Sequence, residues 1–407
     1  MRYTREEVME FIEENNVKFI RLAICDIFGN QKNISIMPNQ LEDAFERGFG
    51  FDASSIPGFA NADHPDLFLF PDPDTLTLLP WRPSQGRVVR FFCNIKYANG
   101  TPFELDSRYI LSKAVKRAKD MGIRCSVGSE CEFYLFNTDE KGRPTDIPLD
   151  NAGYMDVAPM DKGENIRREI CLTLEEMGIT PLSSHHEEGP GQNEIDFRYS
   201  NPLCAADDVI TFRMVVETLA ARNGLFATFA PKPIEGKCGN GYHIDIAPIR
   251  IGTESQTDEA TVDSFMAGIL SHINSMTAFL NPTEESYKRL GTYKAPKYIS
   301  WARENRTQLM RVIPFDGKNK RVELRSPDSR ANPYLALALL INAGLDGIEK
   351  SVVLCPPLDI NMYNAKDEDV KGLCRLPDTK EAATALAENS EFIKKYIPER
   401  IIEQYKG

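Results

Sequence analysis

The chain has 407 residues, of which 42% are hydrophobic, and a formal net charge of −12 at pH 7. This length is enough for a large core and more than one domain. The acidic balance argues against a general binder of nucleic acids or anionic membranes. No segment has the apolar run of a signal peptide or a bilayer span, and nine scattered cysteines form no CxxC pair. We therefore expect a soluble cytoplasmic protein with reduced thiols.

Residues 1–102 are predicted to form a small N-terminal α+β domain. Thr4 is placed to cap a first helix that ends near Asn15, and Glu7 completes a capping box. A hairpin and two further strands are expected to follow, at 17–38, 66–80 and 87–95. The stretch NGTPFELDSR then marks the junction to a second domain.

The second domain, residues 103–407, is expected to alternate strands with long helices. Hydrophobic periodicity and capping residues predict helices at 106–121, 163–177, 205–223, 261–280 and 332–349. The last of these is apolar almost all round, which predicts a buried helix. An acidic stretch at 364–390 precedes a final helical segment. The fold class predicted for the whole chain is α+β.

The segment GSECEFYLF carries two glutamates where a core strand would carry none. Because side chains alternate across a strand, Glu130 and Glu132 share one face while Cys131 and Phe133 share the other. Two neighbouring carboxylates repel each other unless a cation lies between them, and hard divalent cations prefer carboxylate oxygens. The alternative is a half-exposed strand with a solvated acidic face.

Three other segments repeat this division into one apolar and one ionisable face. They are GQNEIDFRYS, GYHIDIAPI and KRVELRS, whose ionisable faces carry Glu194, Asp196 and Arg198, then His243 and Asp245, then Arg321, Glu323 and Arg325. In a sheet that curls, these faces converge on one cavity. Four such strands favour a lined active site over four solvated faces.

Carboxylates with one imidazole and no thiolate fit Mg²⁺ or Mn²⁺ better than zinc or a redox metal. Arginines beside metal-binding carboxylates suit phosphate and carboxylate ligands. This combination indicates phosphoryl transfer, in which catalysis consists mainly of positioning and charge neutralisation. A P-loop is excluded because the chain has no GxxxxGK[ST].

The chain resembles the glutamine synthetase family, in its bacterial type I branch, from about residue 15 to about residue 400. Seven motifs carry the resemblance in order: FDASSIPGF, GSECEFYLF, HHEEGPGQNEIDF, APKPIEGKCGNGYH, ESYKRL, ENRTQLMR and RVELRSPDSRANPYLA. The resemblance implies a β-grasp-like N-terminal domain and a C-terminal catalytic domain whose curved antiparallel sheet lines the active site, with flanking helices. It also implies an ATP-dependent ligase that makes glutamine from glutamate and ammonia through γ-glutamyl phosphate.

The resemblance assigns a role to each candidate site residue. Two Mg²⁺ or Mn²⁺ ions per active site are implied, one held by Glu132, Glu187 and Glu194 and the other by Glu130, His243 and Glu323. Arg289, Arg325 and the backbone of Gly239 resemble the clamp on the substrate glutamate. The groups around ATP and the acyl phosphate would be Arg306, Arg311, Arg321 and Tyr199, with Arg306 catalytic. His185 and His186 are expected to flank Glu187 and to pack or hydrogen-bond locally.

Asp52 and Ser55 lie in the N-terminal domain, which in the family completes the active site of a neighbouring subunit. The Asp helps to bind and deprotonate ammonium there, so a homo-oligomer with shared active sites is implied. The chain ends without the family's usual C-terminal tail, and a hexamer or a weakly stacked dodecamer is therefore expected. No nucleic-acid or membrane partner is expected.

Several positions depart from the family's pattern around the substrate pockets. Lys294 stands in the flap GTYKAP where the family usually has a glutamate, and a lysine repels ammonium. Cys238, Asp245, Ala247 and Leu182 also differ from the usual residues. These departures predict either an enzyme of the same family that uses another amine, or a rearranged loop in which another carboxylate serves. A non-catalytic relative and a carboxylate–metal phosphotransferase such as a guanidino kinase are competing classes.

Overall fold

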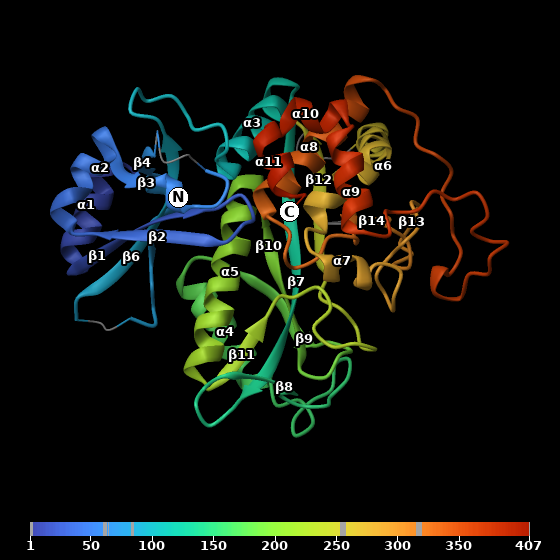
Figure 1. Cartoon of the computed structure of the whole chain (residues 1–407), viewed down its shortest axis with the longest axis horizontal. Coiled ribbons are helices and arrows are strands. Elements are labelled where there is room, and N and C mark those ends of the chain that lie inside the picture. The colour runs from blue at the N-terminus through green and yellow to red at the C-terminus, as the bar shows by residue number, and fades with distance from the viewer. Residues whose placement is uncertain are drawn as a thin grey trace.

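A computed structural model describes residues 3–406, apart from 60–62, 64, 83–84, 253–257 and 315–319. The chain forms two sheets, one from its N-terminal quarter and a larger one from the remainder. In Figure 1 the smaller sheet lies at the left in blue, and the larger sheet stands at the centre beneath a layer of helices. This is the predicted α+β architecture.

The N-terminal sheet has the strand order β2-β1-β6-β4-β3, with β5 paired to β6. Thr4 caps the first helix, and the predicted capping box with Glu7 is present. The predicted hairpin is confirmed, since β1 and β2 pair antiparallel. The element bounds are α1 Arg5–Glu14, β1 Val17–Cys25, β2 Gln31–Ile36, α2 Leu41–Arg47, β3 Phe49–Asp52, β4 Asp66–Pro71, β5 Thr77–Leu78 and β6 Arg87–Lys96.

The large sheet has the order β13-β14-β15-β12-β7-β10-β9, and β8 and β11 also pair with β7. Its strands pair antiparallel except for β13 and β14. The bounds are β7 Ile123–Thr138, β8 Pro144–Pro148, β9 Pro181–His186, β10 Gln192–Ser200, β11 Leu225–Thr228, β12 Tyr242–Arg250, β13 Trp301–Arg303, β14 Met310–Pro314 and β15 Lys320–Leu324.

Helices cover the apolar face of this sheet, because α3 and α5 pack on β7 while α6 packs on β12 and β15. The helix α8 lies against α3, α5 and α6, and every residue from Pro333 to Gly347 is buried, as its composition predicts. The helix bounds are α3 Ser107–Asp120, α4 Glu164–Glu176, α5 Pro202–Arg222, α6 Glu259–Leu280, α7 Glu284–Arg289 and α8 Pro333–Glu349.

Two helical predictions need correction. The helix α5 begins three residues before the predicted start, since Asn201 caps it through Leu203 and Cys204 and Pro202 occupies its first turn. The final helical segment is three short helices, of which the first lies inside the stretch predicted to precede it. These are α9 Lys380–Glu388, α10 Glu391–Tyr396 and α11 Glu399–Gln404, drawn in red beside α8 in Figure 1.

Buried polar contacts join the N-terminal domain to the helices of the C-terminal domain. Arg108 donates to Asp72 of the N-terminal domain at 2.8 Å and to Asp207 of α5 at 3.1 and 3.0 Å. Asn332 and Tyr405 both donate to the carbonyl oxygen of Ile27, each at 3.0 Å. Breaking these contacts would leave polar groups unpaired in the interior, so the N-terminal domain is held firmly against the C-terminal domain of its own chain.

Asp106 caps α3 at this junction and gives a pH prediction. Its carboxylate accepts from the backbone of Arg108 and of Ile95, but burial raises its pKa from 3.8 to about 6. Because the folded protein binds this proton more tightly than the unfolded chain does, protonation stabilises the fold fully at pH values below the unfolded-state pKa. This stabilisation is lost as the pH rises through the folded-state pKa of about 6. We expect the free energy of unfolding of wild type, relative to Asp106→Asn, to fall between pH 4 and pH 6. Urea melts of both proteins at pH 4 and pH 6 measure this difference. A difference in unfolding free energy that is the same at both pH values would contradict the prediction.

Within the part of the chain that the structure describes, no helix is long and apolar enough to cross a membrane. All nine cysteines are free thiols, and burial raises the pKa of Cys25, Cys93, Cys125 and Cys131. These four therefore behave as small apolar core residues rather than as nucleophiles.

Candidate active site

A cavity of about 370 Å³ opens on the polar face of the large sheet. Most of the sequence-predicted site residues line it: Glu130, Glu132, Glu187, Glu194, Gly239, His243, Arg289, Arg306, Arg311, Arg321 and Arg325. Glu323 and Tyr199 lie directly behind this wall, bonded to the lining arginines. The convergence of polar strand faces, predicted from alternation alone, is therefore present.

Strand register explains why these residues meet. In β7, Glu130 stands opposite His243 of β12, and Glu132 stands opposite Glu194 of β10. Glu323 of β15 stands opposite Asp245, two residues beyond His243 on the same face of β12. A one-residue slip in any of these pairings would move the ionisable residues into the apolar core.

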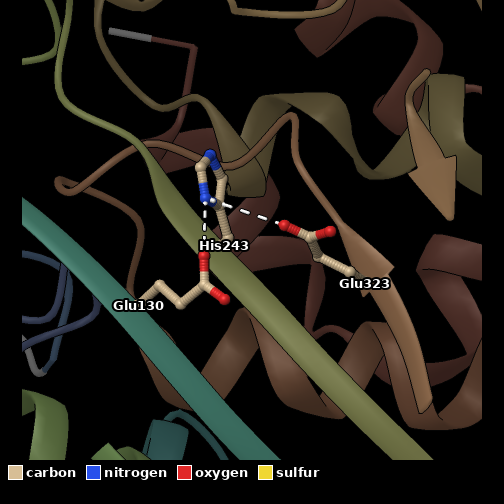
Figure 2. Close-up of side chains that lie close together, drawn as sticks. All are labelled: Glu130, His243 and Glu323. Carbon is tan, nitrogen blue, oxygen red and sulfur yellow. Dashed lines mark hydrogen bonds and ion pairs between the residues drawn. The ribbon is translucent and has the colours of Figure 1, made fainter. Parts of the chain in front are cut away.

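Glu130, His243 and Glu323 form the first cluster (Figure 2). His243 Nδ1 lies 3.1 Å from a Glu130 oxygen and 3.9 Å from a Glu323 oxygen. Their ligand atoms all lie within 4.8 Å of one another, which is the spacing a single cation needs. This is one of the two ligand sets that the resemblance implied.

Glu323 is fully buried and carries the strongest charge pairing in the cluster. Arg325 donates to it at 2.6 Å, and the Nε of Arg311 donates to its other oxygen. Burial alone would raise its pKa, but the charges of Arg325, His243 and Arg311 outweigh burial and hold the pKa near 2. Glu323 is thus a fixed anion that also orients two arginines toward the cavity.

The second cluster, the predicted set of Glu132, Glu187 and Glu194, also lines the cavity, and its assignment to one cation stays a prediction. Among the described residues that line the cavity, two groups beside the first cluster have ligand atoms within 4.8 Å of one another: His185, Glu187 and Glu194, and Glu130, Glu194 and Asp196. One oxygen of Glu132 accepts from Gln192 at 2.9 Å and from the backbone of Gly241 at 2.8 Å.

His185 hydrogen-bonds Glu187 at 3.2 Å, in line with its expected local contact, but its position also makes it a potential cation ligand. The alternation rule could have indicated this, because His185 stands opposite Glu194 and so shares the polar face.

The second cluster suits a cation by its charge. Burial, together with the neighbouring charges of Glu132 and Asp196, raises the pKa of Glu194 well above its ordinary value. Burial likewise raises the pKa of Glu132. A divalent cation among these carboxylates would offset their repulsion and keep them ionised. The residues of this cluster therefore fit a divalent cation.

The arginines surround the carboxylates. Arg289 is buried and donates to the carbonyl oxygen of Ser326 at 2.8 Å, while Gly239 approaches it so closely that an added Cβ would contact its side chain. Arg321 donates to the Tyr199 hydroxyl at 2.6 Å, and that hydroxyl donates to Asp245 at 2.5 Å. Tyr199 therefore supports Arg321 from behind, without lining the cavity itself.

The mouth of the cavity holds a contact that sequence reasoning missed. The ammonium group of Lys294 pairs with Glu188 at 2.6 Å and lies 5.0 Å from the centre of the Tyr154 ring. The other Glu188 oxygen accepts a hydrogen bond from the Cys238 thiol at 3.2 Å. Glu188 thus joins two positions that depart from the family's pattern. The sequence feature that could have indicated this contact is the adjacent acidic pair, Glu187 and Glu188, in HHEEGPG.

Asp52 and Ser55 lie apart from the cavity. Both are exposed, and neither is among the residues that line it. Asp52 caps a 3-10 turn and accepts from Ser54 at 2.9 Å from the backbone and 2.6 Å from the hydroxyl. A single chain therefore does not bring these two predicted residues to the site.

The acidic, arginine-rich cavity on an antiparallel sheet, next to a separate small β domain, defines an enzyme class that handles anionic ligands with divalent cations. The chain belongs to the glutamine synthetase family. Residues 104–407 match the catalytic domain of glutamine synthetase, and residues 16–98 match its beta-grasp domain. The sequence-based recognition and fold class are therefore confirmed, while the exact boundary at residue 102 stays a prediction.

Curated relatives are similar over almost the whole chain. A glutamine synthetase of Clostridium saccharobutylicum is 44% identical over 416 residues, covering 99% of this chain and 94% of the relative. One of Methanosarcina mazei is 41% identical, covering 99% and 92%. Among solved structures, a GmaS/ADP complex superposes with a TM-score of 0.87 at 28% identity, and apo GmaS with 0.88 at 29%. Each covers 98% of this chain and 94% of the other.

Proposed function

We propose that this enzyme is an ATP-dependent glutamate–ammonia ligase that forms glutamine, ADP and phosphate. The observation that carries the proposal is the cavity, which is lined by five arginines and by five of the six predicted cation ligands, with the sixth, Glu323, directly behind its wall. Similarity to curated glutamine synthetases over nearly the full chain supports the same reaction. A non-catalytic relative would be expected to lose ligand positions, and all six are present.

The first step joins the substrate glutamate to phosphate. Arg289, Arg325 and the Gly239 backbone hold the amino-acid end, while Arg306 and Arg321 offset the charge of the ATP phosphates. An oxygen of the substrate's side-chain carboxylate attacks the γ-phosphorus of ATP, and ADP leaves. The result is an acyl phosphate with a good leaving group.

The second step forms the amide. The nitrogen nucleophile attacks the acyl carbon, a proton passes to a nearby carboxylate, and phosphate leaves with one oxygen from the substrate. Two Mg²⁺ or Mn²⁺ ions, held by the two clusters described above, would supply charge neutralisation for the phosphate groups. Glu323 keeps Arg311 and Arg325 oriented throughout, because both guanidinium groups donate to it.

We further propose that the working enzyme is a cytoplasmic homo-oligomer with shared active sites, as a hexamer or dodecamer. Asp52 and Ser55 are exposed and lie off the cavity of their own chain, so a neighbouring subunit is the route by which they reach a site. In that arrangement Asp52 would help to deprotonate the nucleophile.

A second candidate is an enzyme of the same family that uses another amine. It is favoured by Lys294, whose ammonium group occupies a place between Glu188 and the Tyr154 ring that would otherwise suit a free cation. Two solved structures that superpose on this chain are of GmaS, whereas the curated relatives reported above are glutamine synthetases. The two candidates share the acyl phosphate and differ only in the nitrogen nucleophile.

Phosphate release with glutamate, ATP and Mg²⁺, driven by ammonium and then by a panel of primary amines, separates the candidates. Robust turnover at low-millimolar ammonium is expected for glutamine synthesis. An amine with a higher kcat/KM than ammonium would transfer the assignment to the second candidate. Failure of every nucleophile to stimulate phosphate release would contradict both.

Lys294→Glu tests what the lysine does at the mouth. Exchanging its positive charge for a negative one should lower the KM for ammonium by up to about fivefold, since a partly exposed charge pair contributes about 0–1 kcal/mol. The KM for ATP should not change. Lys297→Glu is the matched control, because Lys297 follows on the same loop but pairs with Asp378 outside the cavity. Equal ammonium KM values in both variants would contradict the role of Lys294.

A further inference from the structure

The hairpin of β9 and β10 has polar residues on both faces. Its front presents His185, Glu187 and Glu194 to the cavity. Its back carries His186 and Asn193, which stand opposite each other in the strand register and are 1% and 0% exposed. The buried polar cluster behind the hairpin consists of Asp150, Asp161, Arg167, His186 and Asn193.

This cluster contains two carboxylates and an imidazole, but its hydrogen bonds leave no room for a cation. Asp161 binds Arg167 through both oxygens, at 3.1 and 2.5 Å. Asp150 accepts from His186 at 2.9 Å and from the backbone amides of Ala152, Lys162 and Gly191. Each charge is already paired, which identifies the cluster as a support rather than a second metal site.

His186 connects the cluster to the cavity. Its Nε2 donates to Asp150, and its Nδ1 donates to the carbonyl oxygen of Glu187 at 2.6 Å. Because both ring nitrogens face acceptors, these two hydrogen bonds fix the orientation of the ring.

The same histidine also fixes a second wall of the cavity. Its carbonyl oxygen accepts from the backbone of Met155 at 2.9 Å, and Tyr154 and Met155 both line the cavity. Asp150 anchors the start of this loop and, through the amide of Lys162, its end. One buried hydrogen-bonded pair therefore holds both the backbone of Glu187 and the loop that carries Tyr154.

We propose that Asp150 and His186 are positioning residues that preorganise the cation site at Glu187 and the adjoining wall at Tyr154. The inference rests on the proposed function, because it takes Glu187 and Glu194 as cation ligands. A ligand held by a fixed backbone loses little entropy on binding a metal, and loss of such a support typically weakens metal affinity by about 10–100-fold.

Calorimetric titration of the ATP-free enzyme with Mn²⁺ tests the proposal through Asp150→Ala and Asp150→Asn. Asparagine keeps the size of the side chain and one acceptor oxygen but loses the charge and the second acceptor, so it should disturb the fold less than alanine does. We expect Asp150→Ala to raise the Kd of one Mn²⁺ by about tenfold or more, with Asp150→Asn intermediate. In kinetics, kcat should fall while the KM for ATP stays within about twofold.

Asp346→Ala is the matched control. Asp346 is also a buried carboxylate, paired with Arg117 at 2.9 Å and Lys350 at 3.0 Å, but it lies on α8 away from the cavity. It should lower thermal stability and leave the Kd of Mn²⁺ unchanged. Equal Kd values in wild type, Asp150→Asn and Asp150→Ala would overturn the positioning role.

Glu194→Gln separates a failure of this inference from a failure of the proposed function. If Glu194→Gln weakens Mn²⁺ binding and both Asp150 variants do not, the cation site stands and the support by Asp150 and His186 is wrong. If Glu194→Gln also binds Mn²⁺ as wild type does, the ligand assignment itself is wrong, and the inference falls with it.

Discussion

Replacing Glu323 by alanine should remove one of two Mn²⁺ sites and lower kcat by at least about a hundredfold, since a charge-stabilising group typically contributes that much. It should also lower the free energy of unfolding by about 3–5 kcal/mol, because breaking a buried ion pair leaves uncompensated charge. Glu323 is fully buried, and Arg311 and Arg325 would both lose their carboxylate. Urea melts of the metal-free protein and Mn²⁺ titrations measure the two effects separately.

Glu349→Ala provides the comparison for this variant. Glu349 also accepts from an arginine, Arg117, at 2.7 Å, but its side chain is 58% exposed. Exposed pairs contribute only about 0–1 kcal/mol, so its removal should be nearly neutral and should leave two Mn²⁺ sites. A Glu323→Ala protein that binds two Mn²⁺ ions with wild-type stability would contradict the assigned role of Glu323.

Asp52→Ala should lose activity even though its side chain is exposed and lies off the cavity of its own chain. If subunits share sites, co-expression with Arg325→Ala should restore activity, because some sites then combine an intact Asp52 with an intact Arg325. Random assembly predicts recovery to roughly a quarter of wild type. Glutamate-dependent phosphate release by the purified mixed oligomer measures the recovery.

The control for this complementation pairs Asp52→Ala with Ser55→Ala. Both changes lie in the same N-terminal segment, so every mixed site keeps one defect and no recovery is expected. Full activity of Asp52→Ala alone, or equal recovery in both mixtures, would contradict a site shared in this way.

Strand alternation predicted the most about the site. The placement of Glu130, Glu132, Glu194 and His243 on one polar wall follows from their spacing alone, because successive side chains point to opposite faces. The capping box at Thr4 and the buried helix α8 were equally predictable, since both depend on short-range pattern.

Contacts between separate segments of the chain could not be predicted from the sequence. The approach of His185 to Glu194, and the hydrogen bond from the Gly241 backbone to Glu132, depend on how separate segments meet. The pairing of Lys294 with Glu188 likewise depends on two loops more than a hundred residues apart. Local propensity carries no information on either arrangement.

The transfer of one oxygen from substrate to phosphate tests the central claim most directly, because an acyl phosphate intermediate requires it. Glutamate labelled with ¹⁸O in its side-chain carboxylate would be incubated with ATP, Mg²⁺, the enzyme and the preferred nucleophile. The account predicts one ¹⁸O in the released phosphate for each amide formed, read by mass spectrometry. Amide formation with unlabelled phosphate would contradict it.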